Sequence, residues 1–458
     1  MSAAIADAEV PAASPLASGV ARPAALWAGY RFELAKLATA WRIRLVLLVC
    51  WVAPAGFVAI VSNQSSLPTD TVFGRWMHAT GWSGSLVVLA FACSWALPLL
   101  TSLVAGDVFA AEDRLGTWRH LVVAMRSPQR IFASKALASL TVILAMVTGL
   151  AVSSMVGGLL GAGSHPLVGL DGHLLTAGEA ARSVLLAWLC VLAPTLAFAA
   201  VGLLGSVVLG RSPTGLLVPA VLALAMDLVL MLPVPVAVRV ALPSNAFLAW
   251  RGLFTEPRYD GALLAGIVVS LLWAAVAAAL ARHLFVRRDL AAPAFDGAGR
   301  GAVTVAVLPL AGLVAVTAVV AAVVLPGGGT GSGVGKAKLD ASLATAFGHL
   351  YRLQTRELHR PAVTERQLQA SADCDKGGPR VEDRGPGGDW RCVVSWRLPG
   401  STAVGSAIYQ LDVTPDGRYV ADGDGPKEVN GFFLVHTPDG DMPNPLWQLD
   451  ASVDLLTP

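Results

Sequence analysis

One charged segment between two long apolar stretches contains most of the residues that could do chemistry. It begins with Glu112-Asp113-Arg114-Leu115-Gly116-Thr117 and continues through Ser127-Pro128-Gln129-Arg130 to Lys135. Leucine, tryptophan and valine recur between the charged side chains, which predicts a short amphipathic helix that Pro128 should end or turn. A charged helix at the ends of membrane spans could transmit force to a soluble partner.

The rest of the chain carries only weak signals for catalysis or metal binding. Its eight histidines are scattered, and neither H-E-x-x-H nor Gly-x-Ser-x-Gly occurs. Residues 329–337 are similar to a phosphate loop, but Thr330 and Ala337 occupy the first glycine and the hydroxyl position of G-x-x-x-x-G-K-S/T. We expect a flexible linker there, and no catalytic, cofactor-binding or metal site in this chain.

A single carboxylate, Asp227, lies deep within the apolar stretch from Leu216 to Leu232. An ionised group at that depth is unfavourable unless it faces protein or water. Asp227 could therefore line a translocation pathway or a subunit seam, or it could be a protonated or hydrogen-bonded structural carboxyl. The nearby Pro219, Pro233 and Pro235 predict a bent or broken span.

These residues need a membrane domain to position them. The 458-residue chain is 55% hydrophobic and 14% charged, which is typical of a membrane protein. Its formal charge of +2 and the lack of a basic stripe do not suggest a nucleic-acid partner. Hydropathy in windows of about 19 residues predicts seven helical spans. They lie near residues 45–62, 83–104, 136–160, 182–209, 214–240, 261–281 and 302–325.

The basic residues favour a cytoplasmic N-terminus, because this choice places segment 105–135 and most other arginines on the inside. An odd number of spans then puts the C-terminal part outside the plasma membrane. The composition suggests that the cell is bacterial. Cys374 and Cys392 are the only cysteines in that polar part. An oxidising exterior would let them form a disulfide, and two free thiols are the alternative.

We expect an all-α polytopic membrane domain followed by a small α+β exterior domain. Residues Leu26 to Arg44 show helical spacing of apolar side chains, which predicts an interfacial helix before the first span, with a soluble helical stub as the alternative. The expected division of the chain is a disordered cytoplasmic tail (1–25), a six-helix domain (26–285), a linker with the seventh span (286–326), a glycine-rich linker (327–336) and the exterior domain (337–458).

The exterior domain should contain one helix against an antiparallel sheet. Apolar residues from Leu339 to Tyr351 describe one face of a helix, while Trp390 to Trp396 alternate in the manner of a strand. Asp416-Gly417 predicts a turn between two further strands. Trp390 and Trp396 are expected in the core of this domain, with a ligand platform as the alternative.

Residues 26–285 resemble the membrane subunits of ATP-binding-cassette (ABC) exporters of the type-2 permease family. In this family the first cytoplasmic loop carries a Glu, then Gly-Thr, an apolar stretch, a Pro near a basic residue, and a Lys as the next span begins. The matching residues, in order, are Glu112, Gly116, Thr117, Leu121, Pro128, Arg130 and Lys135. Ser134 stands where the family often has Gly, and the seventh span with its exterior domain departs from the usual six-span unit.

The resemblance implies that the segment docks on a separate ATPase subunit, which would bind ATP and Mg and hydrolyse the ATP. Two permease copies, or this chain and a paralogue, would form a pathway through the lipid for a lipid-like or drug-like substrate. Glu112 and Thr117 would hold the coupling helix, and Gly116 would permit a close approach or a turn. The remaining polar contacts would come from Arg114, Arg119 and Arg130.

Three other interpretations remain open. The charged segment could be a solvated loop that only obeys the positive-inside rule. The chain could instead be a membrane-anchored sensor or binding protein that acts through its exterior domain. An ion-coupled transporter using Asp227 is the third, although the sequence shows no further intramembrane carboxylate and no inverted repeat.

Overall fold

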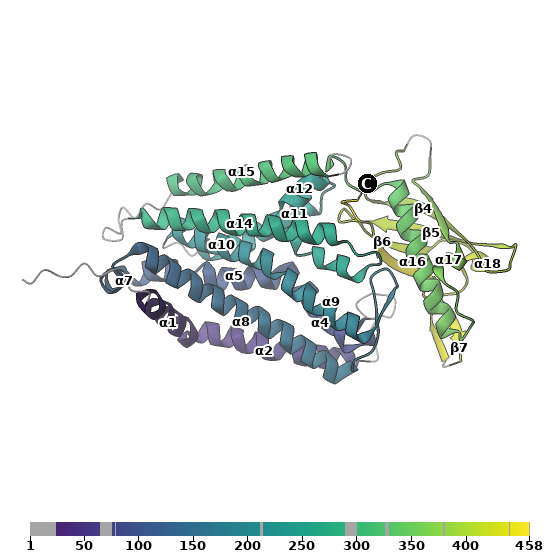
Figure 1. The fold of residues 1–458 in the computed structure, drawn as a ribbon, viewed down its shortest axis with the longest axis horizontal. Helices are drawn as coiled ribbons and strands as arrows, with labels where there is room; N and C mark the ends of the chain where they lie inside the picture. The colour runs from purple at the N-terminus through teal and green to yellow at the C-terminus, as the bar shows by residue number, and fades with distance from the viewer. Residues whose placement is uncertain are drawn as a thin grey trace, which may run out of the picture.

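Apolar helices form one long domain, and a sheet with a covering helix packs against one end of it (Figure 1). The computed structural model describes residues 24–64, 76–77, 79–210, 214–288, 300–325, 329–378, 381–438 and 440–457. The predicted tail, residues 1–25, lies outside this description except for Ala24 and Ala25, which begin the first helix. Parts of both predicted linkers, 289–299 and 326–328, lie outside it as well.

Six helices within the described residues are long and apolar enough to cross a bilayer, so the chain is a multi-pass membrane protein. A helix satisfies its own backbone hydrogen bonds, which lipid cannot do. The spans are α2 (Trp41–Ser62), the continuous α4–η1–α5 (Gly81–Phe91, Ala92–Ala96 and Leu97–Ala105), α8 (Pro128–Ala162), α9–α10 (Ala177–Cys190 and Leu192–Leu209), α14 (Asp260–Val286) and α15 (Arg300–Val324).

The predicted span 214–240 is interrupted. Its first part is α11 (Thr214–Leu230), whose 17 residues extend only about 25 Å at ~1.5 Å per residue. The chain then passes Pro233 and Pro235 before α12 (Val236–Ala241), α13 (Pro243–Ala246) and the 3-10 helix η2 (Ala249–Phe254). Proline disfavours a continuing helix, because it lacks the backbone N–H and its ring meets the preceding turn. Six full-length spans and one shorter apolar helix therefore replace the seven predicted spans.

The N-terminal helix α1 (Ala24–Thr39) precedes the first span, as the apolar spacing predicted, but it ends earlier than Arg44. Ala40 is extended and separates α1 from α2. Tyr30 Oη lies 3.0 Å from Thr141 Oγ1, which joins α1 to α8. Trp27 is 60% exposed, so one face of α1 leaves a large aromatic side chain available to the membrane interface.

The segment between the second and third spans contains two short helices, α6 (Ala110–Leu115) and α7 (Trp118–Met125). Pro128 was expected to end or turn this helical segment; it does not end it, although the chain turns just before it, at Arg126. The helix α7 already ends at Met125, and Pro128 is the first residue of α8. Proline is well suited to that position, because the first residues of a helix have no partner for their backbone N–H.

The C-terminal domain has an antiparallel sheet in the order β3-β4-β5-β6-β9, covered by α16 (Lys336–Glu357). Trp390 is fully buried between sheet and helix, as expected for a core residue, whereas Trp396 is only partly buried and packs against the same core. Gly417 has φ 83° in the β5–β6 turn. The strands are β3 (Ser371–Asp375), β4 (Gly387–Arg397), β5 (Val404–Val413), β6 (Arg418–Gly423) and β9 (Gln448–Ser452); the smaller elements are α17 (Glu365–Leu368), α18 (Lys427–Asn430), β7 (Leu434–Thr437) and β8 (Gly440–Pro443).

The predicted disulfide between Cys374 and Cys392 is present. The two residues are directly opposite each other in the β3–β4 register. Cross-strand neighbours have Cβ atoms close enough for a bridge, so the sheet brings the two thiols together.

Candidate functional site

The charged segment 105–135 lies at the end of the helical domain farthest from the sheet, where Figure 1 shows α7 beside the start of α1. Its two short helices turn sharply at Gly116, which has φ 67°. The Gly116 amide donates to the Glu112 carbonyl oxygen at 2.9 Å and so closes the end of α6. A residue with a Cβ would be strained in this left-handed conformation. The glycine thus permits α7 to follow α6 directly.

Glu112 points inward from α6, and its side chain is 1% exposed. Its Oε1 accepts a hydrogen bond from Lys135 Nζ at 2.7 Å, and the same Nζ donates to Glu33 Oε2 at 2.9 Å. Lys36 Nζ and Thr117 Oγ1 also donate to the Glu112 carboxylate. This network, which we call the Glu112 network, joins α1, α6 and α8.

The charges of the Glu112 network balance each other. Burial alone would raise the pKa of Glu112, but the Lys135 ammonium and the hydrogen bonds from Lys135, Lys36 and Thr117 lower it to about 2. Glu112 is therefore ionised at neutral pH. Removing one member would leave a buried charge without its partner, which is strongly unfavourable. The network thus holds the segment in one arrangement on the spans.

A second set of contacts holds the other side of the segment. Arg288 Nη2, just beyond the end of α14, donates to Asp113 Oδ2 at 2.8 Å, and Trp118 Nε1 donates to Asp113 Oδ1 at 2.6 Å. Beneath them, aromatic rings from α7, α8, α14 and the residue before α6 pack with centroids 4.9 to 6.4 Å apart: Trp118, Phe132, Phe285 and Phe109. Such ring pairs add to the stabilisation from apolar burial. The segment is thereby attached to α14 as well as to α8.

The start of α6 is held from a third span. Ser206 Oγ, on α10, accepts hydrogen bonds from the backbone N–H groups of Phe109 (3.1 Å) and Ala110 (3.0 Å). These N–H groups belong to the first turn of α6, where no partner exists within the helix. A buried serine therefore caps α6 from outside.

The opposite face of the segment is open to solvent. Leu115 is 68% exposed and Val123 is 77% exposed. Arg114, which pairs with Asp107, and Arg119 are also exposed, while Arg130 is partly buried. Large exposed apolar side chains rimmed by charged ones are typical of a protein interaction surface. We call the face formed by Arg114, Leu115, Arg119 and Val123 the outer face.

The residues expected to act together therefore fall into two groups. Glu112, Thr117 and Lys135 lie inside and hold the segment, whereas Arg114 and Arg119 lie on the outer face. Glu33, Lys36 and Arg288 complete the inner contacts, but the sequence did not single them out as partners. Their only signal was charge at the ends of apolar stretches, close to the predicted membrane boundary.

Other residues singled out from sequence lie elsewhere. Asp227 is half-buried on α11 and is not a member of the Glu112 network. Lys336, the lysine of the segment similar to a phosphate loop, begins α16 and donates to Asp373 and to the Cys374 carbonyl oxygen. In the described part of the chain, no group of three or more His, Cys, Asp or Glu side chains could hold a metal ion.

No protein-family model matches this chain, and no curated protein is significantly similar to it in sequence. What the site can do is inferred from its geometry and its motif. It presents an outer surface on a short helix pair that is attached to several membrane spans at once.

Proposed function

We propose that this chain is the membrane-spanning permease subunit of an ATP-driven exporter of the ABC type-2 kind. In this proposal α6 and α7 form the coupling element that docks on a separate ATPase subunit. The observation that carries the proposal is the Glu112 network, which fastens the element to α1 and α8 while its outer face stays open. The order of Glu112, Gly116, Thr117, Pro128 and Lys135 in the sequence supports the same family.

The proposed mechanism is mechanical. ATP and Mg bind to the partner subunits, and the closure of two such subunits displaces the outer face of each permease copy. A coupling element must not deform under this load, because only rigid, closely packed elements pass a displacement on. Lys135 lies near the start of α8, and Arg288 lies just beyond α14. Movement of α6 would therefore reach both spans.

In the proposed topology the shorter helix α11 crosses the membrane together with the six full-length spans, so the two ends of the helical domain face opposite sides. The outer face and the N-terminus are cytoplasmic, and the C-terminal domain is extracytoplasmic. Two copies of this chain, or one copy and a paralogue, enclose the pathway for a lipid-like or drug-like substrate, and Asp227 is the candidate pathway residue. ATP hydrolysis takes place on the partner subunit.

The test must alter the outer face without disturbing the buried Glu112 network that holds α6 in place. Glu112→Arg would break the buried network and confuse lost docking with lost folding. The double variant Leu115→Glu/Val123→Glu changes only exposed side chains, and Val381→Glu/Val393→Glu is its matched control, because these valines are 49% and 41% exposed on the C-terminal domain.

Tagged full-length protein would be purified from its native cells in mild detergent, and Mg-dependent ATPase activity in the eluate would be measured. We expect an ATPase to copurify with the wild type and the control, and to be lost with Leu115→Glu/Val123→Glu. Size-exclusion profiles would show that all three proteins are folded. Recovery of no ATPase with the wild type, or equal recovery with the outer-face variant, would contradict the proposal.

A further inference from the structure

A cavity of about 390 Å³ lies where the C-terminal domain meets the helical domain. Its volume falls in the range of roughly 300–1,000 Å³ that is typical of small-molecule sites. The hairpin between α8 and α9, with strands β1 (Leu167–Val168) and β2 (Leu174–Leu175), contributes one wall. The other wall comes from α16 and from residues 442–450. Apolar side chains dominate both walls, including Val168, Leu170, Leu350, Leu353, Met442 and Leu449.

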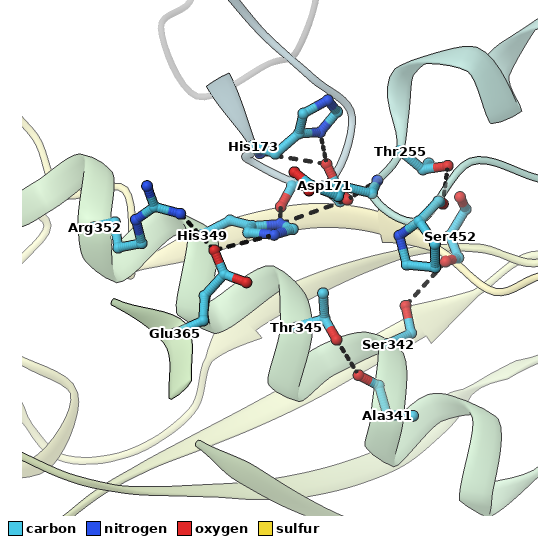
Figure 2. A network of polar contacts seen from close by, with 12 residues as sticks. Asp171, His173, Thr255, Ala341, Ser342, Thr345, His349, Arg352, Glu365 and Ser452 are labelled. Carbon is cyan, nitrogen blue, oxygen red and sulfur yellow. Dashed lines mark hydrogen bonds and ion pairs between the residues drawn. The ribbon is translucent and has the colours of Figure 1, made fainter. Parts of the chain in front are cut away.

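A buried polar contact holds the two walls together, as Figure 2 shows. His349 Nδ1 donates to the Asp171 carbonyl oxygen at 3.2 Å and lies 3.5 Å from Asp171 Oδ2. Asp171 Oδ2 also accepts a hydrogen bond from the Glu256 backbone N–H at 2.7 Å. Leu170 and Gly172 flank Asp171, and Leu350 follows His349, so the lining is built on both sides of this contact. The cavity is thus a fixed feature of the domain junction.

The charged side chains among the described lining residues are all acidic. Of the described residues that line the cavity, Glu357 and Asp450 are carboxylates, and none is lysine, arginine or histidine. Glu357 is half-buried and is the last residue of α16, so the negative end of the helix dipole adds to its charge. An apolar cavity with negative potential favours a ligand that combines apolar surface with positive charge.

The polar amides of the lining are already engaged within the protein. Asn444 Oδ1 accepts hydrogen bonds from Gln354 Nε2 at 2.7 Å and from the Leu446 amide at 3.0 Å. Gln448 Nε2 donates to Asp422 Oδ1 at 2.6 Å. Asp450 also has an interaction of its own within the protein, so the electrostatic preference of the cavity is set by Glu357.

We propose that this cavity binds a small lipophilic cation. The apolar walls take the hydrocarbon or aromatic part of the ligand, and Glu357 faces its charge. Because the ligand would touch both domains, its binding would stabilise their junction. This site is separate from the outer face of α6 and α7, and it does not depend on coupling to ATP.

The probe is tetraphenylphosphonium, with tetraphenylborate as an anion of the same shape. Equilibrium binding of both ions would be measured on the full-length protein in lipid nanodiscs, after subtraction of binding to empty nanodiscs. We expect saturable binding of the cation and weaker binding of the borate. Glu357→Gln should weaken cation binding by roughly 10-fold, the loss typical of one charge-assisted contact.

Leu353→Trp would fill the cavity, and Leu398→Trp is the matched control, because Leu398 is 39% exposed and does not line it. We expect the first variant to lose cation binding and the second to keep it. Equal affinity for the two ions, or unchanged cation binding by Leu353→Trp, would overturn the proposal.

A second measurement covers the case in which Leu353→Trp does not fold. A diazirine-labelled alkylammonium ion would be photolysed on the wild-type protein, and the modified peptides mapped by mass spectrometry. Labelling within residues 350–357 or 442–450, reduced by excess tetraphenylphosphonium, would support the site. Labelling elsewhere only would refute it.

Discussion

His349 on α16 donates a hydrogen bond to the carbonyl oxygen of Asp171, a residue 178 positions earlier in the loop between two membrane spans. Two further contacts cross the same junction. Arg251 Nη1 donates to Asp416 Oδ2 at 2.9 Å, and Tyr259 Oη donates to the Ser452 carbonyl oxygen at 2.8 Å. The C-terminal domain is therefore docked on the helical domain through buried and partly buried polar groups.

The docking of the two domains should weaken as the pH rises. Although burial opposes its charge, the Asp171 carboxylate raises the pKa of His349, with a smaller contribution from Glu365. The pKa of Asp171 is lowered, because His173, His349 and the Glu256 amide outweigh its burial. A raised pKa means that the stabilisation is complete below the unfolded value of about 6.5 and is lost as pH rises through the folded value.

The measurement is hydrogen exchange of residues 169–173 at pH 6 and pH 9, corrected for the intrinsic rate. Protection should fall at pH 9 in the wild type, whereas His349→Gln should be poorly protected at both values. Two further ionisable side chains lie near this contact: His173 pairs with Asp171, and Arg352 pairs with Glu365. His173→Gln therefore serves as a control. A pH dependence that persists in His349→Gln would assign the effect to another group.

The Glu112 network should be essential for stability. Lys135→Met leaves Glu33 and Glu112 beside each other without the ammonium between them, so we expect the free energy of unfolding to fall by about 3–5 kcal/mol. Arg119→Met removes an exposed cation from the same segment and should change it by less than about 0.5 kcal/mol. Thermal unfolding of both variants in detergent, followed by size-exclusion chromatography, compares them. Equal melting temperatures for the two would rule out a stabilising role for the network.

The disulfide should stabilise the C-terminal domain. Cys374 and Cys392 are 18 residues apart, and closing a loop of that size contributes about 3 kcal/mol in the chain-entropy estimate. Cys374→Ser/Cys392→Ser should therefore unfold this domain at a lower temperature, whereas Cys190→Ser should not. Alkylation of free thiols in freshly lysed cells tests the proposed exterior position. Rapid labelling of both cysteines would place them in a reducing compartment instead.

Asp227→Asn tests the proposed pathway role of this carboxylate. The substitution keeps the shape but removes the charge, so transport and substrate-stimulated ATPase activity of the assembled exporter should fall. Glu382→Gln, at an exposed position of the C-terminal domain, is the control and should have no effect. Full activity of Asp227→Asn would leave Asp227 with a structural role only.

Several elements could be predicted because their cause is local. A long apolar stretch must become a helix in lipid, and alternation in Trp390 to Trp396 is enough to indicate a strand. The interruption after α11 was visible in Pro233 and Pro235, because two closely spaced prolines remove backbone donors and disfavour a continuing helix. The length of α11 was not visible, since hydropathy alone does not show where the helix ends. The role of Pro128 was predicted wrongly, because proline is found at the start of a helix as well as after its end.

The sequence by itself determined the membrane domain, the α+β character of the C-terminal domain and the cysteine pair, because each depends on composition or on short-range periodicity. Only the tertiary structure decided which charges meet. Lys135 reaches Glu33 across 102 residues, and His349 reaches Asp171 across 178. Such pairs are selected by the packing of whole helices, which no local pattern encodes. The inward position of Glu112, the open outer face and the cavity at the domain junction all follow from that packing.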